Sequence, residues 1–269
     1  MIQKRAKDVL RVAAKGVFTA ADIFSPRMAG PRILIYHQIG AGLGRQMEVT
    51  QENFARQIDW VLDHGEILDL DSAIEQRGNP GADETYVLTF DDGYRDMYER
   101  AWPILQQKRL PFTLYLTTGP VESGQPLTPG GRADPLTWAQ IEEMLASGLM
   151  TLGAHTNNHK DLRSISVDEV EAEIGESNEL ISDRTGVAPT HFAYPWGYWS
   201  RQADPVIRQA YTSAALGSGP PVVAATDTYL LNRVPVQLSD GMVFFKKKMR
   251  TGLRLEDRTR RRIVGYDGP

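Results

Sequence analysis

The stretch YVLTFDDGY, residues 86–94, joins an apolar, strand-like run to two adjacent carboxylates and a glycine. Tyr, Val, Leu, Thr and Phe in such a run favour a β-strand that is buried on both faces. Asp91 and Asp92 end the strand, and two neighbouring carboxylates stay ionised only at a high free-energy cost unless a cation lies near them. The alternative interpretation is an ordinary Asp-Gly turn with a capping aspartate, which is commoner for an isolated Asp-Asp-Gly.

Other strand-like runs alternate with amphipathic helical patterns along the chain. This alternation is typical of a mainly parallel sheet with helices outside it. We therefore predict an α/β fold, a distorted and incomplete (β/α) barrel of about seven parallel strands. The expected strands are Arg32–His37, Tyr86–Asp92, Phe112–Thr117, Met150–Thr156, Thr190–Trp196, Thr212–Gly217 and Tyr229–Val236.

Three amphipathic stretches, Glu52–His64, Arg95–Arg109 and Val167–Arg184, are expected to be helices. Capping-box spacing, Thr137 with Gln140 and Ser166 with Glu169, predicts two helix starts. The segment Pro120–Pro135 is rich in Gly and Pro and predicts one long surface loop, of the kind that often borders an active site.

The composition excludes several kinds of chemistry. The 269 residues include no cysteine, so disulfides, thiolate metal sites and a cysteine nucleophile are excluded. A bound metal must therefore have His, Asp, Glu or backbone oxygen as ligands. No stretch approaches the roughly 18 apolar residues of a membrane span. The amino terminus lacks the apolar core of a signal peptide, so we expect a soluble, cytoplasmic protein.

Charge is unevenly distributed along the chain. Residues 1–27 carry six basic and two acidic side chains, and residues 246–262 carry nine basic and two acidic ones. Residues 28–245 carry 15 basic and 29 acidic side chains. Basic ends on an acidic body predict contact with anionic lipid, hence membrane association, or with a phosphate-bearing substrate. Solvated tails are the alternative interpretation.

Two histidines four residues apart follow another apolar strand. His155 and His159, in the segment GAHTNNH of residues 153–159, can point at one centre if the chain turns helically there. That arrangement suits Zn²⁺ or a similar divalent ion. A lone pair of this spacing often arises by chance. Here, however, the histidines and the aspartates each follow a strand, and the carboxyl ends of barrel strands meet at one face. Together they favour a metal site.

Two further motifs offer polar or aromatic groups at strand ends. In FAYPWGYW, residues 192–199, five of eight residues are aromatic, which suits the apolar faces of a sugar or an aromatic core. The run ILIYH, residues 33–37, ends in His37. A histidine there could be a general acid near neutral pH or a structural residue bonded to backbone.

The motifs TFDDGY (89–94), HTNNH (155–159) and FAYPWG (192–197) resemble those of the polysaccharide deacetylase family, also called the NodB-homology domain or carbohydrate esterase family 4. They occur in the family's order, and the resemblance covers residues 31–240. It implies a distorted (β/α) barrel that removes acetyl groups from sugars or glycans containing N-acetylglucosamine. We therefore expect a deacetylase domain over 31–240, a basic helical extension over 1–30 and a basic tail over 241–269.

The resemblance also assigns roles to individual residues. It implies that Asp91 is the catalytic base and that the backbone N–H of Trp196 helps to form the oxyanion hole. One divalent metal ion, Zn²⁺ by default and Co²⁺, Ni²⁺ or Fe²⁺ as alternatives, would bind to Asp92, His155 and His159. Tyr94, Tyr194 and Pro195 are expected to contact the substrate.

Two departures from the family pattern concern the base and the acid. Most members carry an arginine that steadies the base where this chain has Ala193. Most also have a late Leu-x-His sequence, whereas residues 230–234 here read LLNRV. A subgroup that deacetylates poly-N-acetylglucosamine resembles this chain in its early Tyr-His strand end, and its early histidine is the acid. His37 is then the expected acid, with His64 at a helix end and His191 outside the first set of contacts.

These roles imply hydrolysis of an N-acetyl group by metal-activated water, with an aspartate base and a histidine acid. An O-acetyl esterase and a non-catalytic glycan-binding protein of the same fold are the alternatives. The expected partner is an N-acetylated sugar, a lipid-linked sugar or a polysaccharide, and no nucleic acid.

Overall fold

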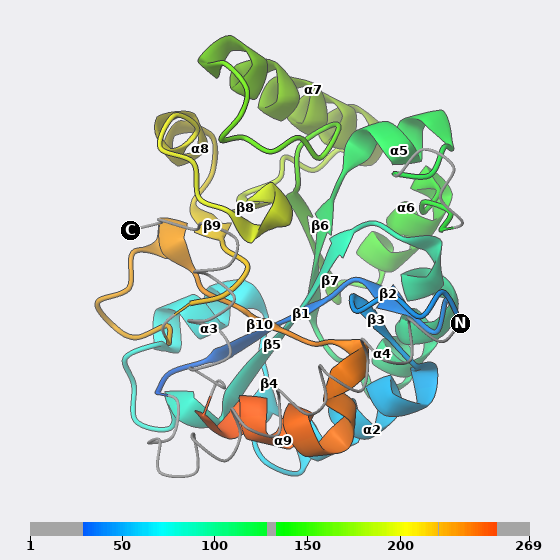
Figure 1. The fold of residues 1–269 in the computed structure, drawn as a ribbon, viewed down its shortest axis with the longest axis vertical. Coiled ribbons are helices and arrows are strands. Elements are labelled where there is room, and N and C mark those ends of the chain that lie inside the picture. The colour runs from blue at the N-terminus through cyan, green and yellow to red at the C-terminus, as the bar shows by residue number, and fades with distance from the viewer. Residues whose placement is uncertain (1–28, 128–132, 220, 252–269) are drawn as a thin grey trace, which may run out of the picture.

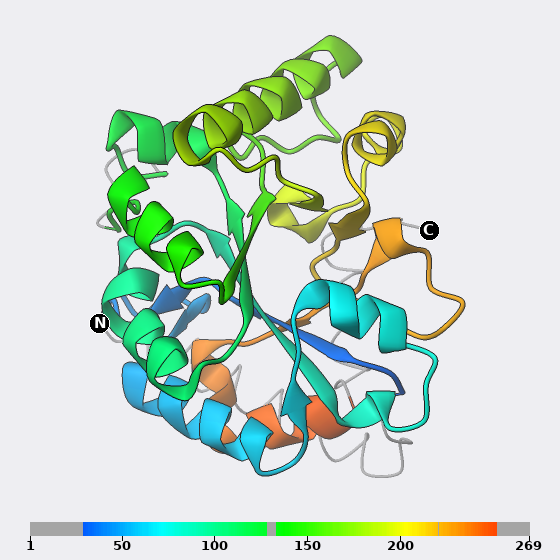
Figure 2. The same cartoon turned by 180° about the vertical axis from the view of Figure 1, so that it is seen from behind.

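The computed structural model describes residues 29–127, 133–219 and 221–251. Seven strands form a path of parallel neighbours in the order β10-β1-β5-β6-β7-β8-β9. The sheet curls into an incomplete barrel with helices around it (Figures 1 and 2). This confirms the predicted α/β barrel. The seven strands are β1 (Arg32–Tyr36), β5 (Thr85–Asp92), β6 (Phe112–Leu116), β7 (Met150–Ala154), β8 (His191–Ala193), β9 (Ser213–Ala215) and β10 (Val234–Pro235).

Three short strands lie beside this path. β4 (Glu66–Ile67) pairs with the start of β5, and β2 (Gln38–Ile39) pairs with β3 (Glu48–Val49) in a separate small sheet. Because the pair β2–β3 directly follows β1, it holds the loop of residues 40–47 near the carboxyl ends of the barrel strands. The proline of β10 is tolerated because that strand is at an end of the path, where a missing N–H breaks no ladder.

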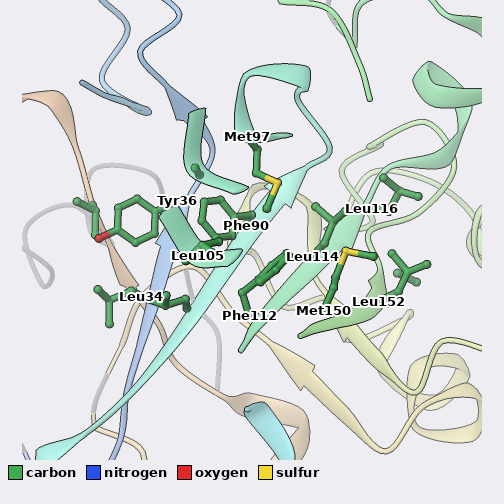
Figure 3. Close-up of a cluster of buried hydrophobic side chains, with 14 of the residues drawn as sticks. Leu34, Tyr36, Phe90, Met97, Leu105, Phe112, Leu114, Leu116, Met150 and Leu152 are labelled. Atoms are coloured by element: carbon green, nitrogen blue, oxygen red, sulfur yellow. The ribbon is translucent and has the colours of Figure 1, made fainter. Parts of the chain in front are cut away.

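The strands read as nearly continuous apolar runs because both of their faces are buried. One set of side chains packs under the surrounding helices, and Figure 3 labels ten of its members, among them Leu34, Phe90 and Leu114. The alternate set, including Ile33 and Val87, fills the inside of the barrel. Leu70 and Ala73 belong to this inner cluster, so their helix closes the end of the barrel opposite the strand carboxyl ends.

Four helices, α2, α3, α6 and α7, begin at a residue whose side chain caps the first turn. Ser166 and Thr137 both form complete capping boxes, which confirms both predicted helix starts. The α-helices are α2 (Gln51–Leu62), α3 (Leu70–Gln76), α4 (Trp102–Lys108), α5 (Thr118–Ser123), α6 (Trp138–Ala146), α7 (Val167–Thr185), α8 (Asp204–Ala210) and α9 (Gly241–Thr251). Short 3₁₀ turns occur at Ala82–Glu84, Pro195–Gly197, Thr228–Leu230 and Leu238–Asp240.

Three segments differ from the sequence-based expectation. The helix predicted over residues 95–109 is a π-helix at Met97–Ala101 followed by α4, because Pro103 cannot donate to the carbonyl four residues earlier. The predicted loop from Pro120 begins instead inside α5, which tolerates Pro120 in its first turn. The last predicted strand starts as a 3₁₀ turn because Asp227 accepts a hydrogen bond from the Tyr229 N–H.

The carboxy-terminal part of the described chain packs on the barrel. Phe245 and Met249 of α9 are buried, and α9 contacts α2. Lys248 of α9 forms a buried ion pair with Asp240, with 2.8 Å between Nζ and the carboxylate oxygen. The expected basic extension up to residue 28 and the tail from residue 252 lie outside the described residues. Within the described ranges, no helix combines the length and apolar character that a membrane crossing needs.

Candidate metal centre and active-site pocket

A pocket of about 630 Å³ opens at the carboxyl ends of the strands. Parallel strands present these ends on one face, so residues distant in the sequence meet there. His37 follows β1, Asp91 and Asp92 end β5, and His155 follows β7, and all four line the pocket. The remaining lining residues are Ile35, Gln38, Arg45, Met47, Tyr94, Leu127, Asn158, His159, Trp196, Gly197, Tyr198, Gly217, Arg233 and Pro235.

Asp92, His155 and His159 converge on one centre in this pocket. Their candidate ligand atoms all lie within 4.8 Å of one another. The Nε2 atoms of His155 and His159 lie 3.5 and 3.4 Å from the same Asp92 oxygen. That oxygen is buried and has no hydrogen-bond partner among the described residues. A buried, unpartnered carboxylate oxygen is costly, and a cation held with both imidazoles would satisfy it. The donor set therefore fits a divalent metal ion.

Burial sets the protonation of these three side chains in the metal-free protein. It lowers the pKa of His155 to about 3 and that of His159 to about 4, so both imidazoles are neutral near pH 7. Burial also raises the pKa of Asp92 to about 6, and the charge of Asp91 adds to this effect. Neutral imidazole and ionised carboxylate are the ligand forms that a divalent cation needs, and both are present near neutral pH.

The orientation of His155 is fixed by a hydrogen bond outside the metal centre. Its Nδ1–H donates to the backbone carbonyl of Ala193 across 2.7 Å. This contact assigns the proton to Nδ1 and leaves the Nε2 lone pair free to face the other two ligands. The carboxyl end of β8 thus supports a ligand that follows β7.

The turn between the two histidines is held by α7. The buried Glu173 carboxylate accepts hydrogen bonds from the backbone N–H and the side-chain amide of Asn158, at 2.7 and 3.0 Å. The Thr156 hydroxyl accepts a further bond from the His159 N–H at 3.0 Å. These contacts stabilise a strained turn, since Thr156 and His159 both have positive φ angles of 64° and 56°.

Asp91 has the opposite environment from its neighbour. Arg233 donates to both of its carboxylate oxygens, each at 2.7 Å, and both side chains are buried. Burial alone would raise the pKa of Asp91, but the charge and hydrogen bonds of Arg233 outweigh burial and lower it to about 2. Arg233 is itself held by the Leu216 carbonyl and the Thr89 hydroxyl. Asp91 is therefore ionised and fixed in orientation.

His37 borders the same centre, and the other two histidines do not. The charged form of His37 lowers the pKa of both Asp91 and Asp92, and its buried Nδ1 has no partner among the described residues. His64 stacks on Trp60 at the end of α2. His191 lies at the amino end of β8 and does not line the pocket.

The sequence model of the polysaccharide deacetylase family matches residues 78–215, just over half of the chain. The chain belongs to this family. The Bacillus subtilis (strain 168) protein YxkH, whose name assigns it to the polysaccharide deacetylases, is 27% identical over 204 residues, which cover 74% of this chain and 68% of YxkH. A Staphylococcus aureus poly-beta-1,6-N-acetyl-D-glucosamine N-deacetylase is 26% identical over 176 residues, covering 62% of this chain and 59% of that enzyme.

Solved structures give the same fold. IcaB from Ammonifex degensii superposes with a TM-score of 0.72 at 23% identity, covering 82% of this chain and 98% of IcaB. The Streptococcus pyogenes deacetylase PplD superposes with a TM-score of 0.68 at 25% identity, covering 84% of this chain and 99% of PplD. The family's curled, incomplete barrel is thus present in this chain.

Arg233 accounts for the first departure from the deacetylase pattern. The sequence has Ala193 where most family members carry the arginine beside the base, and Arg233 supplies a guanidinium from the segment that leads into β10. Sequence reasoning missed this role. The available signal was a single charged residue within the mainly apolar run of residues 230–236, which is expected to be buried and therefore paired.

The three residues that follow β8 divide into two groups. Trp196 lines the pocket, is 60% exposed, and has its ring 5.1 Å from that of His159. Tyr194 and Pro195 are buried and are not among the pocket-lining residues described, and the Tyr194 hydroxyl lies 3.4 Å from Asp204.

A tight turn brings Trp196 to the pocket. Trp196 has a φ angle of 62°, and a side chain on the next residue, Gly197, would collide with the backbone of Gly217. Tyr94 also lines the pocket, and its hydroxyl hydrogen-bonds Asp92. Two of the four residues expected to contact the substrate or the oxyanion, Trp196 and Tyr94, therefore border the proposed metal centre.

Proposed function

We propose that this protein is a metal-dependent N-deacetylase of an N-acetylated sugar or polysaccharide. The observation that carries the proposal is the Asp92–His155–His159 donor set beside a carboxylate, Asp91, that a buried arginine holds ionised. Glycan binding alone does not need an unpartnered carboxylate facing two neutral imidazoles. Membership of the polysaccharide deacetylase family supports the same reaction class.

A divalent ion bound there, Zn²⁺ by default and Co²⁺, Ni²⁺ or Fe²⁺ as alternatives, would supply Lewis acidity for the acetyl carbonyl and for the attacking water. Asp91 accepts the proton of that water. The bidentate contact with Arg233 makes Asp91 a weaker base, but it keeps both oxygens in one plane and stops protonation of the resting carboxylate. The backbone N–H of Trp196 is the proposed donor to the developing oxyanion.

His37 is the proposed acid. The amine leaves only after it gains a proton, and histidine is the side chain that donates near neutral pH. His155 and His159 are assigned to the metal, and Arg233 cannot give up its proton. Acetate and the free amine are then the two products.

The proposed substrate is a sugar or polymer containing N-acetylglucosamine, either free or linked to a lipid. One relative is named a poly-beta-1,6-N-acetyl-D-glucosamine N-deacetylase, which supports a substrate of this class. We also propose that residues 31–240 form the deacetylase domain, and that the basic segments at both ends of the chain contact anionic membrane. Co-sedimentation with vesicles containing phosphatidylserine, compared with neutral vesicles, tests that contact, and equal binding to both would contradict it.

Amine release tests the reaction. Chelator-treated protein, reloaded with Zn²⁺, Co²⁺ or Ni²⁺, is incubated with β-1,4- and β-1,6-linked N-acetylglucosamine oligomers, and acetate and free amine are both quantified. We expect the two products in equal amounts, and far less of both from the matched Asp91→Asn variant. Acetate without amine from O-acetylated glycans, with no turnover of the N-acetylated oligomers, would indicate an esterase. Glycan binding without release of acetate from any substrate would indicate a binding protein.

A further inference from the structure

Arg45 lies at the mouth of the pocket, on the loop between β2 and β3. Its side chain is exposed, and its charge partly opposes the rise in the pKa of Tyr94 that burial and the neighbouring Asp92 cause. That hydroxyl in turn hydrogen-bonds Asp92. Arg45 and Tyr94 therefore line the same pocket as the proposed metal ligands.

The loop that carries Arg45 is held in place on both sides of this residue. The buried Glu48 carboxylate accepts hydrogen bonds from two loop N–H groups, including that of Gly44 at 2.7 Å. The backbone N–H of Glu48 donates to the carbonyl of Arg45 at 3.2 Å. The next carbonyl, that of Gln46, accepts from the Leu238 N–H at 3.0 Å. The backbone of Arg45 is thus fixed at the pocket by a buried carboxylate and a neighbouring segment.

The guanidinium has no carboxylate partner within residues 29–127, 133–219 and 221–251. This is unexpected on charge balance, because residues 28–245 contain 29 acidic and 15 basic side chains. The other basic residue of the pocket with a permanent charge, Arg233, is fully paired with Asp91. Asp92 faces the proposed metal. The charge of Arg45 is therefore uncompensated at the pocket mouth in the described structure.

We propose that Arg45 binds an anionic group of the substrate, a phosphate or a carboxylate close to the acetamido group that is hydrolysed. This inference rests on the proposed deacetylase function and specifies its substrate class. A guanidinium offers a planar pair of donors that matches the oxygens of either anion. The pocket volume of about 630 Å³ is typical of a site that encloses more than an acetamido group. Among the N-acetylated substrates of the proposed function, an acidic amino-sugar derivative is then preferred over a neutral polymer.

Substrate preference tests the assignment. We would measure kcat/KM of the metal-loaded enzyme on N-acetylglucosamine 1-phosphate, on the disaccharide of N-acetylglucosamine with N-acetylmuramic acid, and on neutral N-acetylglucosamine disaccharide. The phosphate and the muramic carboxylate distinguish the two sources of negative charge. We expect wild type to prefer one of the anionic substrates. Arg45→Gln should reduce that preference about 10- to 100-fold, through KM, because a charged hydrogen bond is lost.

Two control variants accompany Arg45→Gln. Arg45→Lys keeps the charge and should retain part of the preference, and Arg56→Gln, an exposed arginine on α2 that does not line the pocket, should leave it unchanged. Higher salt should weaken the wild-type preference because the contact is exposed. A wild-type preference for the neutral disaccharide, or an unchanged preference in Arg45→Gln, would overturn the assignment.

A binding experiment separates this inference from the proposed function. Calorimetric affinity for N-acetylglucosamine 1-phosphate and for the muramic disaccharide is measured on wild type and Arg45→Gln, whether or not either ligand is turned over. Weaker binding of an anionic ligand to Arg45→Gln supports the anion site even if no acetate is released, in which case only the deacetylase proposal fails. If Arg45→Gln binds each ligand with the same affinity as wild type, the anion site is overturned. The proposed deacetylation of neutral glycans is then unaffected.

Discussion

His155 and His191 are both buried histidines of one parallel sheet, but they lie at opposite ends of their strands. His155 follows β7 at the carboxyl end, where its Nε2 faces an Asp92 oxygen with no hydrogen-bond partner among the described residues. His191 begins β8 at the amino end, where Nδ1 contacts the Ser213 hydroxyl at 2.8 Å and Nε2 contacts Asp71 at 3.3 Å.

The second cluster combines a serine, a histidine and an aspartate, as a hydrolase triad does, yet its geometry indicates a structural role. Ser213 is 1% exposed, and neither Ser213 nor His191 lines the main pocket. Every ring nitrogen of His191 has a partner, whereas the His155 centre leaves a buried carboxylate oxygen unsatisfied. Residue type alone therefore does not distinguish a functional site from a structural cluster. Unsatisfied polar groups beside a pocket make that distinction.

The strongest test of this contrast removes both histidines of the proposed metal centre, His155 and His159. In a His155→Ala/His159→Ala double variant, only Asp92 remains of the proposed donor set, so we expect loss of bound metal and of nearly all turnover. Metal content after dialysis is measured by plasma emission spectrometry, with His64→Ala as the matched control. Wild-type metal content in the double variant would place the metal elsewhere.

Removing the base should affect turnover and spare the metal. Asp91→Asn should keep its metal, because Asp92 is the ligand, and should lose about 10²- to 10⁴-fold in kcat, as is usual for a general base. Rate and metal content are measured on the same preparation. If the variant loses metal and keeps its rate, the two aspartates have exchanged roles.

Removing the proposed acid should affect substrates unequally. His37→Ala is expected to lower kcat about 100-fold or more on an N-acetylated sugar, whose amine must gain a proton. An activated aryl acetate needs no such proton, so its hydrolysis should fall far less. Both rates are measured on the same preparation of each protein, and their ratio is compared between wild type and variant. Equal losses on both substrates would show that His37 is not the acid.

Metal affinity should depend on pH through Asp92. In the metal-free protein the pKa of this carboxyl is about 6, whereas those of His155 and His159 are about 3 and 4. Protons therefore compete for Asp92 first, and the apparent affinity should fall about tenfold per unit as pH drops below about 6. Above that value it should be nearly constant. Competition with a calibrated chelator between pH 5 and 8 measures it, and an affinity independent of pH over this range would contradict the assignment.

The smallest effect on the metal centre is expected from a change in the cluster of Ser213, His191 and Asp71 at the amino end of the strands. His191→Ala leaves the buried Ser213 hydroxyl without its partner, so the free energy of unfolding should fall by about 1–3 kcal/mol. Metal affinity and kcat should stay at wild-type values. Urea unfolding and chelator competition provide the two measurements. A loss of metal affinity larger than tenfold would show that the two ends of the barrel are coupled.

Much of the fold could be predicted because its determinants are local. Apolar runs placed all seven barrel strands, and the side chains of Thr137 and Ser166 placed two helix starts. The π-helix was not predicted, because its cause, Pro103, is equally compatible with a helix start there. The loop predicted from Pro120 failed for the same reason, since proline marks first turns of helices as well as loops.

The site was predictable where a motif carried it and not where distant residues meet. Asp92 ends one strand and His155 directly follows another, so their convergence at the carboxyl ends follows from a parallel barrel. The partnership of Arg233 with Asp91 joins positions 142 residues apart, and nothing in either local sequence points to the other. Arg45 was likewise hidden, because only the folded chain brings its loop to the pocket.

The strained backbone around the pocket has a consequence for laboratory evolution. Asp92, Thr156, His159 and Trp196 are four of the five non-glycine residues with positive φ in the described chain, and each such residue costs about 1–3 kcal/mol. Glycine would relieve that cost at any of them, yet two of them, Asp92 and His159, are proposed metal ligands whose side chains glycine would remove. A library screened for heat resistance alone should therefore enrich glycine at Asp92 and His159. The selected proteins would be more stable and would lack two of the three proposed metal ligands.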